Sequence, residues 1–153
     1  MKNKDLQSIY EGVYSKGKEK FFTFDTLDIT EQVFGELDWQ GLNVLEIGCG
    51  IGDTAARIAT AGATKVTACD YSESAIKTAK ENHNLDNLEF EVASIQDTKG
   101  EYDCIVMQEV IEHTDNPFET IELLSKYIAV GGHLILTCPS FLNIRGYVWM
   151  TLQ

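Results

Sequence analysis

The sequence predicts one α/β domain in which a parallel sheet is connected by crossover helices. From residue 42 onward, short apolar runs alternate with helix-like segments of about ten residues. Three closely spaced glycines follow the first apolar run and precede the first of these helices. The 153 residues are enough to bury a single core, and the chain contains no internal repeat or low-complexity segment.

Composition and charge exclude several classes of protein. A hydrophobic content of 44% is typical of a globular chain and not of a disordered one. The net charge of −12 repels nucleic-acid backbones, which argues against sequence-independent binding to them. No apolar stretch approaches the roughly 18 residues of a membrane span, and the first residues lack a signal-peptide core, so we expect a cytoplasmic location. The four cysteines form no CxxC pair and are expected to be reduced, apolar thiols.

The first half of the chain predicts two helices, then a strand and a third helix. Residues 1–40 carry aromatic and apolar side chains among charges, and we expect two helices there with a break near 17–23. Asn43–Ile47 is a short apolar run and is predicted to be a strand. Asp53–Ala61 has the pattern of a helix, which Gly62 is placed to end. Its buried face is expected to hold Ala55, Ile58 and Ala59.

The next unit repeats this order. Lys65–Cys69 is a β-branched run that ends at Asp70, and it predicts a second strand. Ser72 is expected to cap the following helix. The buried stripe of that helix would consist of Ala75, Ile76 and Ala79. Leu88–Ala93 alternates between apolar and polar residues, as a strand does.

The last part of the regular pattern, residues 102–138, predicts a strand, a helix and a further strand. Tyr102–Met107 is an apolar run and a strand candidate. Asn116–Glu119 has the cap, proline and acid typical of a helix start. We expect this helix to end at Gly131–Gly132 and His133–Cys138 to form the fifth strand. The apolar positions of the helix are Phe118, Ile121, Leu124 and Ile128.

The glycine turn in VLEIGCGIG (44–52) restricts the ligand that the domain can hold. A phosphate-binding P-loop needs a lysine after the glycines, and none follows here. A dinucleotide motif needs a third glycine at position 53, where Asp53 would instead oppose a pyrophosphate at the helix N-terminus. A cationic nucleoside without phosphate, such as S-adenosyl-L-methionine, fits better. Glu46 can attract its ammonium group, and Asp70 can accept hydrogen bonds from both ribose hydroxyls.

Four stretches resemble the class I S-adenosylmethionine-dependent methyltransferases, in the order and spacing of that family. They are VLEIGCGIG (44–52), VTACDYSESAIKTAKEN (66–82), YDCIVMQEVIEH (102–113) and LLSKYIAVGGHLILTCP (123–139). The resemblance implies a Rossmann-like, doubly wound and mostly parallel sheet that binds the cofactor at its carboxyl edge. It also suggests a helical cap over 1–40, the cofactor-binding core over 41–140, and the start of an interrupted C-terminal segment over 141–153.

The resemblance also implies which residues line the cofactor. Glu46, Gly48, Gly50 and Gly52 would surround the methionine portion, with the backbone of Gln108 near it. Asp70 would hold the ribose, or would be only an acid at a helix entry; Tyr71 would lie against the adenine, or would be exposed without contact. Ser94 stands where the family usually has an acid for the adenine amino group, followed by Ile95. Asp97 is an alternative partner for that group.

Methyl transfer also requires a group that removes a proton from the acceptor. His113, after the fourth strand, is the candidate base. The alternative is a histidine that only organises its loop. Glu109, Glu112 and His113 also resemble the metal-binding stretch of ubiquinone-type O-methyltransferases. The histidine further along the chain, His133, lies in the run predicted as the fifth strand and is not counted as a ligand, so we expect no metal.

The predicted activity is therefore methyl transfer from S-adenosylmethionine to a small-molecule acceptor by in-line displacement. Two alternatives stay open: a non-catalytic cofactor-binding module and a nicotinamide-dependent oxidoreductase. The fifth strand would form an apolar edge, and folded proteins normally cover such an edge. We therefore expect further chain beyond this one, or self-association through that edge or the C-terminal segment.

Overall fold

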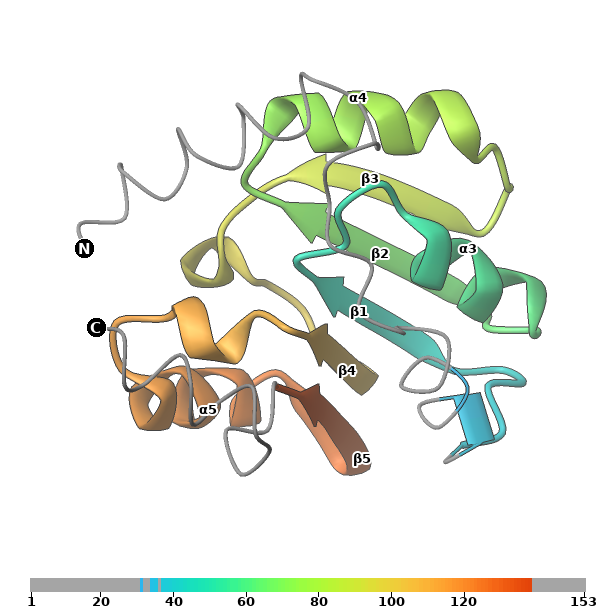
Figure 1. The fold of residues 1–153 in the computed structure, drawn as a ribbon. Helices are drawn as coiled ribbons and strands as arrows, with labels where there is room; N and C mark the ends of the chain where they lie inside the picture. Colours follow the sequence, from blue (N-terminus) through green and yellow to red (C-terminus); the bar gives the residue numbers. More distant parts are fainter. Residues whose placement is uncertain (1–30, 32–33, 36, 139–153) are drawn as a thin grey trace.

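A five-stranded parallel sheet forms the centre of the molecule, with the strand order β3-β2-β1-β4-β5 (Figure 1). The computed structural model describes residues 31, 34, 35 and 37–138. The two helices predicted within 1–40 and the segment 141–153 fall almost entirely outside these residues. The strands are β1 (Asn43–Ile47), β2 (Lys65–Asp70), β3 (Leu88–Val92), β4 (Tyr102–Gln108) and β5 (Ile128–Thr137). This order confirms the Rossmann-like, doubly wound sheet.

Helices cover both faces of the sheet. Helices α3 (Asp53–Thr60) and α4 (Glu73–Asn82) lie on one face, and α5 (Pro117–Ser125) lies on the other (Figure 1). On the first face Val44 packs with Ile58 of α3 and Ile76 of α4. On the second face Leu124 of α5 packs with alternate residues of the same strands, including Leu45 and Ile105. Because both faces are buried, the central strands are continuous apolar runs and do not alternate.

Local sequence signals start α4 and α5 and end α3 as predicted. The Ser72 side chain accepts a hydrogen bond from the Ala75 N–H at 3.2 Å and caps α4. Asn116 caps α5 by accepting from the backbone of Phe118 at 3.1 Å, and Pro117 occupies its first position. The buried stripes of α3 and α4 contain all six predicted residues. Gly62 follows α3 with φ of 105°.

The prediction for the end of α5 was wrong. The helix ends at Ser125, and β5 begins at Ile128, so the Gly131–Gly132 pair lies inside a strand and not after a helix. Tyr102 pairs with Ile128 while Cys104 pairs with His133, which makes an irregular bulge at the start of β5. Gly131 has φ of 83° there. The reason is a tertiary contact: Ile128 pairs with β4 as part of a strand, although its spacing in the sequence fits a helix equally well.

The predicted apolar face of α5 is also only partly buried. Leu124 has no exposed surface, but Phe118 is 84% exposed and Ile121 is 37% exposed among the described residues. Three-to-four-residue spacing alone therefore overestimated how much of this helix faces the sheet.

The carboxyl ends of four strands meet at one edge of the sheet. Ile47 of β1 is in register with Cys69 of β2 and Met107 of β4, and Asp70 is in register with Val92 of β3. The loops that follow these strands are therefore neighbours. In the described part of the chain, no helix is both long enough and apolar enough to cross a membrane.

Candidate active site

The loop after β1 is a tight turn that only glycine accommodates easily. Gly48, Gly50 and Gly52 have φ of 73°, 54° and 85°, in the left-handed region. The turn is anchored to β2, because the N–H groups of Gly48 and Cys49 both donate to the Cys69 carbonyl, at 2.8 and 3.0 Å. Gly52 then forms the N-cap of α3, without any side-chain cap. The backbone is thus turned toward the strand edge where the predicted ligand would bind.

Two side chains from distant parts of the chain press against this turn. A Cβ added to Gly48 would collide with the side chain of Val110, which follows β4. A Cβ added to Gly52 would lie 2.5 Å from the ring of Phe90 in β3. Sequence reasoning missed both Val110 and Phe90, because only the fold brings them to the glycines. The turn therefore needs glycine for space as well as for conformation.

Glu46 is a buried acid beside the turn. It is 3% exposed and accepts a hydrogen bond from the Ala55 backbone at the start of α3. Its second oxygen, Oε2, is buried and has no hydrogen-bond partner among the described residues. The pKa of Glu46 is raised to about 8, chiefly by burial; the hydrogen bond from Ala55 opposes this shift, and the charges of Asp70 and Asp53 add to it. An unpartnered carboxyl oxygen of this kind suits a ligand that brings a positive charge or a hydrogen-bond donor.

Asp70 connects the glycine turn to the next helix. It is 7% exposed, its Oδ2 accepts from the Gly50 N–H at 3.0 Å, and its Oδ1 accepts from the Ser72 N–H at 2.9 Å. The helix-entry role considered for Asp70 is therefore present. This role is compatible with ribose binding, because a carboxylate can accept several hydrogen bonds.

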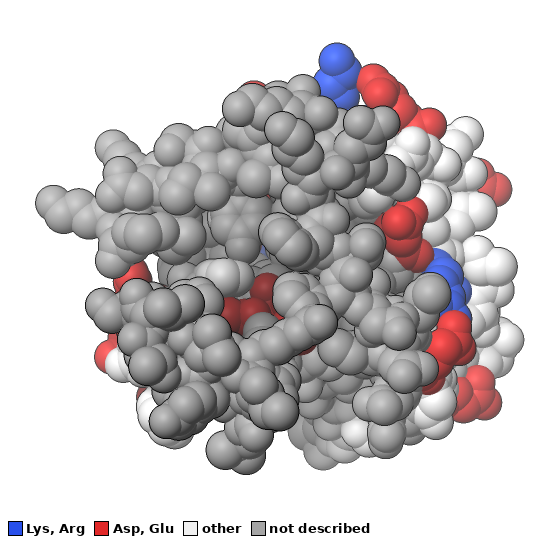
Figure 2. All heavy atoms as spheres, in the orientation of Figure 1, with Lys and Arg blue, Asp and Glu red and all other residues white. Residues whose placement is uncertain are grey.

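Asp53, which argued against a pyrophosphate, lies at the first position of α3 as expected. Its side chain is 65% exposed, and Oδ1 lies 3.1 Å from Nε2 of His83. Water and His83 can therefore weaken its field. The buried acids beside the turn are Glu46 and Asp70. The described charged residues visible in Figure 2 are mostly acidic.

Tyr71, Ser94 and Ile95 follow the ends of β2 and β3 and are all half-buried. The Ser94 hydroxyl and N–H both contact Oδ2 of Asp97, at 2.7 and 2.9 Å. These hydrogen bonds lower the pKa of Asp97. The two alternative partners for an adenine amino group therefore form one hydrogen-bonded unit, and the carboxylate of Asp97 helps to orient the Ser94 hydroxyl.

Gln108 is the last residue of β4, and its side chain makes a contact that the sequence did not predict. Its Oε1 accepts a hydrogen bond from the Thr54 hydroxyl at 2.9 Å. Thr54 lies in the first turn of α3, so this bond connects the end of β4 to the start of α3, directly after the glycine turn. Nothing in the local sequence around either residue indicated this pairing.

The residues after β4 form a strained and acidic segment. Glu109 has φ of 53°, which is rare for a residue with a side chain, and its N–H donates to the Thr137 carbonyl at 3.1 Å. Glu109 and Glu112 each have one buried carboxylate oxygen with no partner in the described part of the chain. Burial raises the pKa of Glu112, the charge of Glu109 adds to this effect, and His113 opposes it.

His113 ends a short 3-10 turn over Ile111–His113. Its side chain is 42% exposed, and Nε2 lies 3.9 Å from Oε1 of Glu112. This distance is too long for a hydrogen bond but allows the carboxylate to act on the imidazole through its field. Within residues 31, 34, 35 and 37–138, no three His, Cys, Asp or Glu side chains are grouped closely enough to hold a metal ion.

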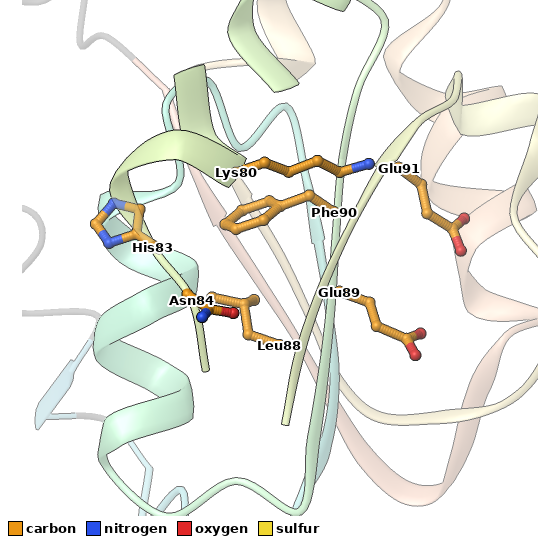
Figure 3. Close-up of a pocket in the computed structure, with 7 residues that line it drawn as sticks. All are labelled: Lys80, His83, Asn84, Leu88, Glu89, Phe90 and Glu91. Atoms are coloured by element: carbon orange, nitrogen blue, oxygen red, sulfur yellow. The ribbon is translucent and has the colours of Figure 1, made fainter. Parts of the chain in front are cut away.

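A separate pocket of about 500 Å³ opens beside β3 and the end of α4 (Figure 3). Lys80, His83 and Phe90 lie on the α4 side of β3 in this view, whereas Glu89 and Glu91 point the other way. The pocket therefore lies on a helical face of the sheet and not at the strand ends. Its full lining is Lys80, His83, Asn84, Leu88, Glu89, Phe90 and Glu91.

Comparison with known proteins identifies the family. Residues 38–145 match a family model described as a methyltransferase domain. The chain is 32% identical over 116 residues to the mitochondrial ubiquinone biosynthesis O-methyltransferase of Dictyostelium discoideum, covering 66% of this chain and 36% of that protein. It is 33% identical over 134 residues to the protein of the same name from Schizosaccharomyces pombe, covering 82% and 48%. The chain thus spans about half the length, or less, of these curated relatives.

A solved structure shows the same fold. The chain superposes on the protein of a DhpI–SAM–HEP complex with a TM-score of 0.79 and 21% identity, over 98% of this chain and 71% of that one. The glycine turn, the strand order and the matched domain all agree with the resemblance noted in the sequence. The chain therefore belongs to the class I S-adenosylmethionine-dependent methyltransferase family.

Proposed function

We propose that the protein uses S-adenosylmethionine to methylate a small-molecule acceptor by in-line displacement at the methyl carbon. The observation that carries this proposal is the pair of buried acids at the glycine turn, Glu46 and Asp70, which are 3% and 7% exposed. A ligand with an ammonium group and free ribose hydroxyls complements these acids, whereas a nicotinamide dinucleotide would bring its pyrophosphate to the N-terminus of α3, where Asp53 opposes it. The match to a methyltransferase domain supports the same assignment.

The acceptor is proposed to carry a hydroxyl group, because the two curated relatives are named as O-methyltransferases. A hydroxyl must lose its proton as its oxygen attacks the methyl carbon. We assign this step to His113, whose exposed imidazole follows β4 at the edge where the cofactor would bind. Glu112 would favour the protonated imidazole that forms, since its carboxylate oxygen lies 3.9 Å from Nε2.

The remaining site residues have supporting roles in this proposal. The turn of Gly48, Gly50 and Gly52 would let the methionine portion approach the backbone, and Gln108 would close that side. Ser94 would accept a hydrogen bond from the adenine amino group, with Tyr71 and Ile95 against the ring. The helices expected within residues 1–40 would cover the bound cofactor.

Two further parts of the proposal concern surroundings. A cytoplasmic location is supported by the four cysteines, which are free thiols in this structure; cell fractionation would contradict it if the protein sediments with mitochondria. Self-association through the edge of β5 is supported by its exposed Val130. Analytical ultracentrifugation that finds only monomer at high concentration would contradict that part.

Calorimetric titration tests the central proposal. S-adenosylmethionine and S-adenosylhomocysteine should bind, and NADH should not. If NADH binds at micromolar concentration and neither of the other ligands does, the oxidoreductase alternative replaces this proposal. Release of S-adenosylhomocysteine in the presence of a panel of phenolic, amine and carbon acceptors then separates an enzyme from a binding module.

A further inference from the structure

Glu46 has an unusual environment for a carboxyl group that is expected to meet a cation. One oxygen is held by the Ala55 backbone, while Oε2 is buried without any partner among the described residues. The side chain is 3% exposed, so bulk solvent has little access to it. A negative charge at this position is therefore poorly solvated.

The surrounding ionisable groups also oppose a negative charge on Glu46. Asp70 acts on it from the end of β2, and Asp53 acts on it from the start of α3. The thiols of Cys49 and Cys69 are the other titratable neighbours, and Glu46 contributes to raising their pKa values. The pKa of Glu46 is accordingly raised to about 8, with burial as the largest cause. Asp70 accepts two backbone hydrogen bonds, so of these two acids it is the one better suited to carry the charge.

We propose that Glu46 holds a proton in the ligand-free protein and releases it to solvent when the ammonium group of the methyl donor binds beside Oε2. This inference rests on the proposed function and adds a property to it: cofactor binding is coupled to the loss of one proton. The O–H bond of the carboxyl group breaks, the proton passes to buffer, and the resulting carboxylate is balanced by the ligand's ammonium.

This coupling makes the site selective for charge. Without ligand, the neutral carboxyl group of Glu46 is not repelled by the charge of Asp70. Glu46 becomes a carboxylate only when the ligand's cation compensates for its charge. A nucleoside that lacks the ammonium group leaves Glu46 protonated. The methyl donor and its demethylated product both carry that ammonium, so both should displace the proton, whereas 5′-methylthioadenosine should not.

Isothermal titration calorimetry in buffers of different ionisation enthalpy measures the protons released on binding. The ligand's α-amino group also titrates, with a usual pKa of about 7.7–8.0, so the useful quantity is the difference between the wild type and Glu46→Gln. At pH 7, where the ligand's amino group and Glu46 are both mainly protonated before binding, the wild type should release most of one proton more than Glu46→Gln on binding S-adenosylhomocysteine, and this excess should disappear as the pH rises above 8. Glu101→Gln, at an exposed loop residue, should behave as the wild type.

The outcomes separate the inference from the function. A proton difference near zero at pH 7, with S-adenosylhomocysteine still bound by both proteins, overturns the inference and leaves the function intact. No binding of either cofactor form to the wild type overturns the function itself. If Glu46→Gln does not fold, the wild type alone decides, because it must release more protons with S-adenosylhomocysteine than with 5′-methylthioadenosine at pH 7; equal release contradicts the coupling.

Discussion

Asp70 and Gly50 are joined by a hydrogen bond of 3.0 Å from the Gly50 N–H to Oδ2 of the carboxylate. The acid expected to recognise the ribose therefore also holds the glycine turn in place. Binding and turn geometry are consequently coupled at this residue, and a substitution there should affect both.

Replacing Asp70 with alanine removes the acceptor for Gly50 and Ser72 together with the proposed ribose contacts. We expect affinity for S-adenosylmethionine to fall by about 1.5–3 kcal/mol, which is roughly a 10- to 150-fold increase in Kd, as for lost hydrogen bonds to a charged group. Calorimetry measures the affinity, and thermal unfolding should show lower stability as well. Asp86→Ala, at an exposed residue, is the matched control. Unchanged affinity in Asp70→Ala would remove Asp70 from the site.

Gly52→Ala should destabilise the protein and weaken cofactor binding. The new methyl group would meet the ring of Phe90 at 2.5 Å, at a φ of 85° that costs a residue with a side chain about 1–2 kcal/mol. Gly35→Ala offers a contrast, because no atom lies within 4 Å of its added Cβ and it should be neutral or stabilising. Chemical denaturation compares the two. The double variant Gly52→Ala with Phe90→Ala should lose less unfolding free energy than the sum of the losses in the two single variants. Strictly additive losses would mean that the contact between position 52 and Phe90 does not affect stability.

The stability of the ligand-free protein should carry a pH dependence from Glu46. Its native pKa of about 8 exceeds the ordinary value of 4.5, so between these values the native state binds more protons than the unfolded state. The contribution of Glu46 to the free energy of unfolding is fully present below pH 4.5 and is lost as the pH rises through 8. Glu46→Gln removes the effect, so its stability relative to the wild type should rise across this window, by on the order of 4 kcal/mol. Parallel pH profiles for the two proteins in urea denaturation would show that Glu46 is already ionised at neutral pH.

His113→Gln should reduce turnover without reducing cofactor affinity. A general base contributes about 100- to 10,000-fold to rate, so kcat should fall within that range while the Kd for S-adenosylmethionine stays the same. His133→Gln, at an exposed position in β5, controls for the change of residue type. A fall in cofactor affinity with unchanged turnover would instead indicate that His113 only organises its loop.

Thr54→Val tests the link between α3 and the end of β4. It removes the 2.9 Å hydrogen bond to Oε1 of Gln108 with little change in volume, and the expected loss of stability is about 1 kcal/mol. Thr64→Val removes a hydrogen bond of similar length, to the Gly41 carbonyl, at the amino ends of β1 and β2 and away from the carboxyl edge. If Gln108 is positioned by Thr54, only Thr54→Val should also weaken cofactor binding. Equal binding by both variants would limit this bond to a structural role.

Most elements of the fold could be predicted because their signals are local. Ser72 and Asn116 cap helices through their own side chains, and continuous apolar runs identify strands that are buried on both faces. The exception was the region around Ile128, where helical spacing and strand propensity compete within the same residues. There the pairing of Tyr102 with Ile128 decided the outcome, and no sequence window contains both partners.

The positions of Glu46, Asp70 and the three glycines relative to a strand end follow from the sequence by itself, since strand, turn and helix succeed one another within a few residues. Only the tertiary structure shows that Phe90 and Val110 occupy the space beside Gly52 and Gly48, that Asp70 bonds to Gly50, and that Oε2 of Glu46 has no described partner. The physical reason is that burial and contact depend on neighbours from separate strands. Residue type and spacing determine which groups are available, and packing determines which of them can carry a charge.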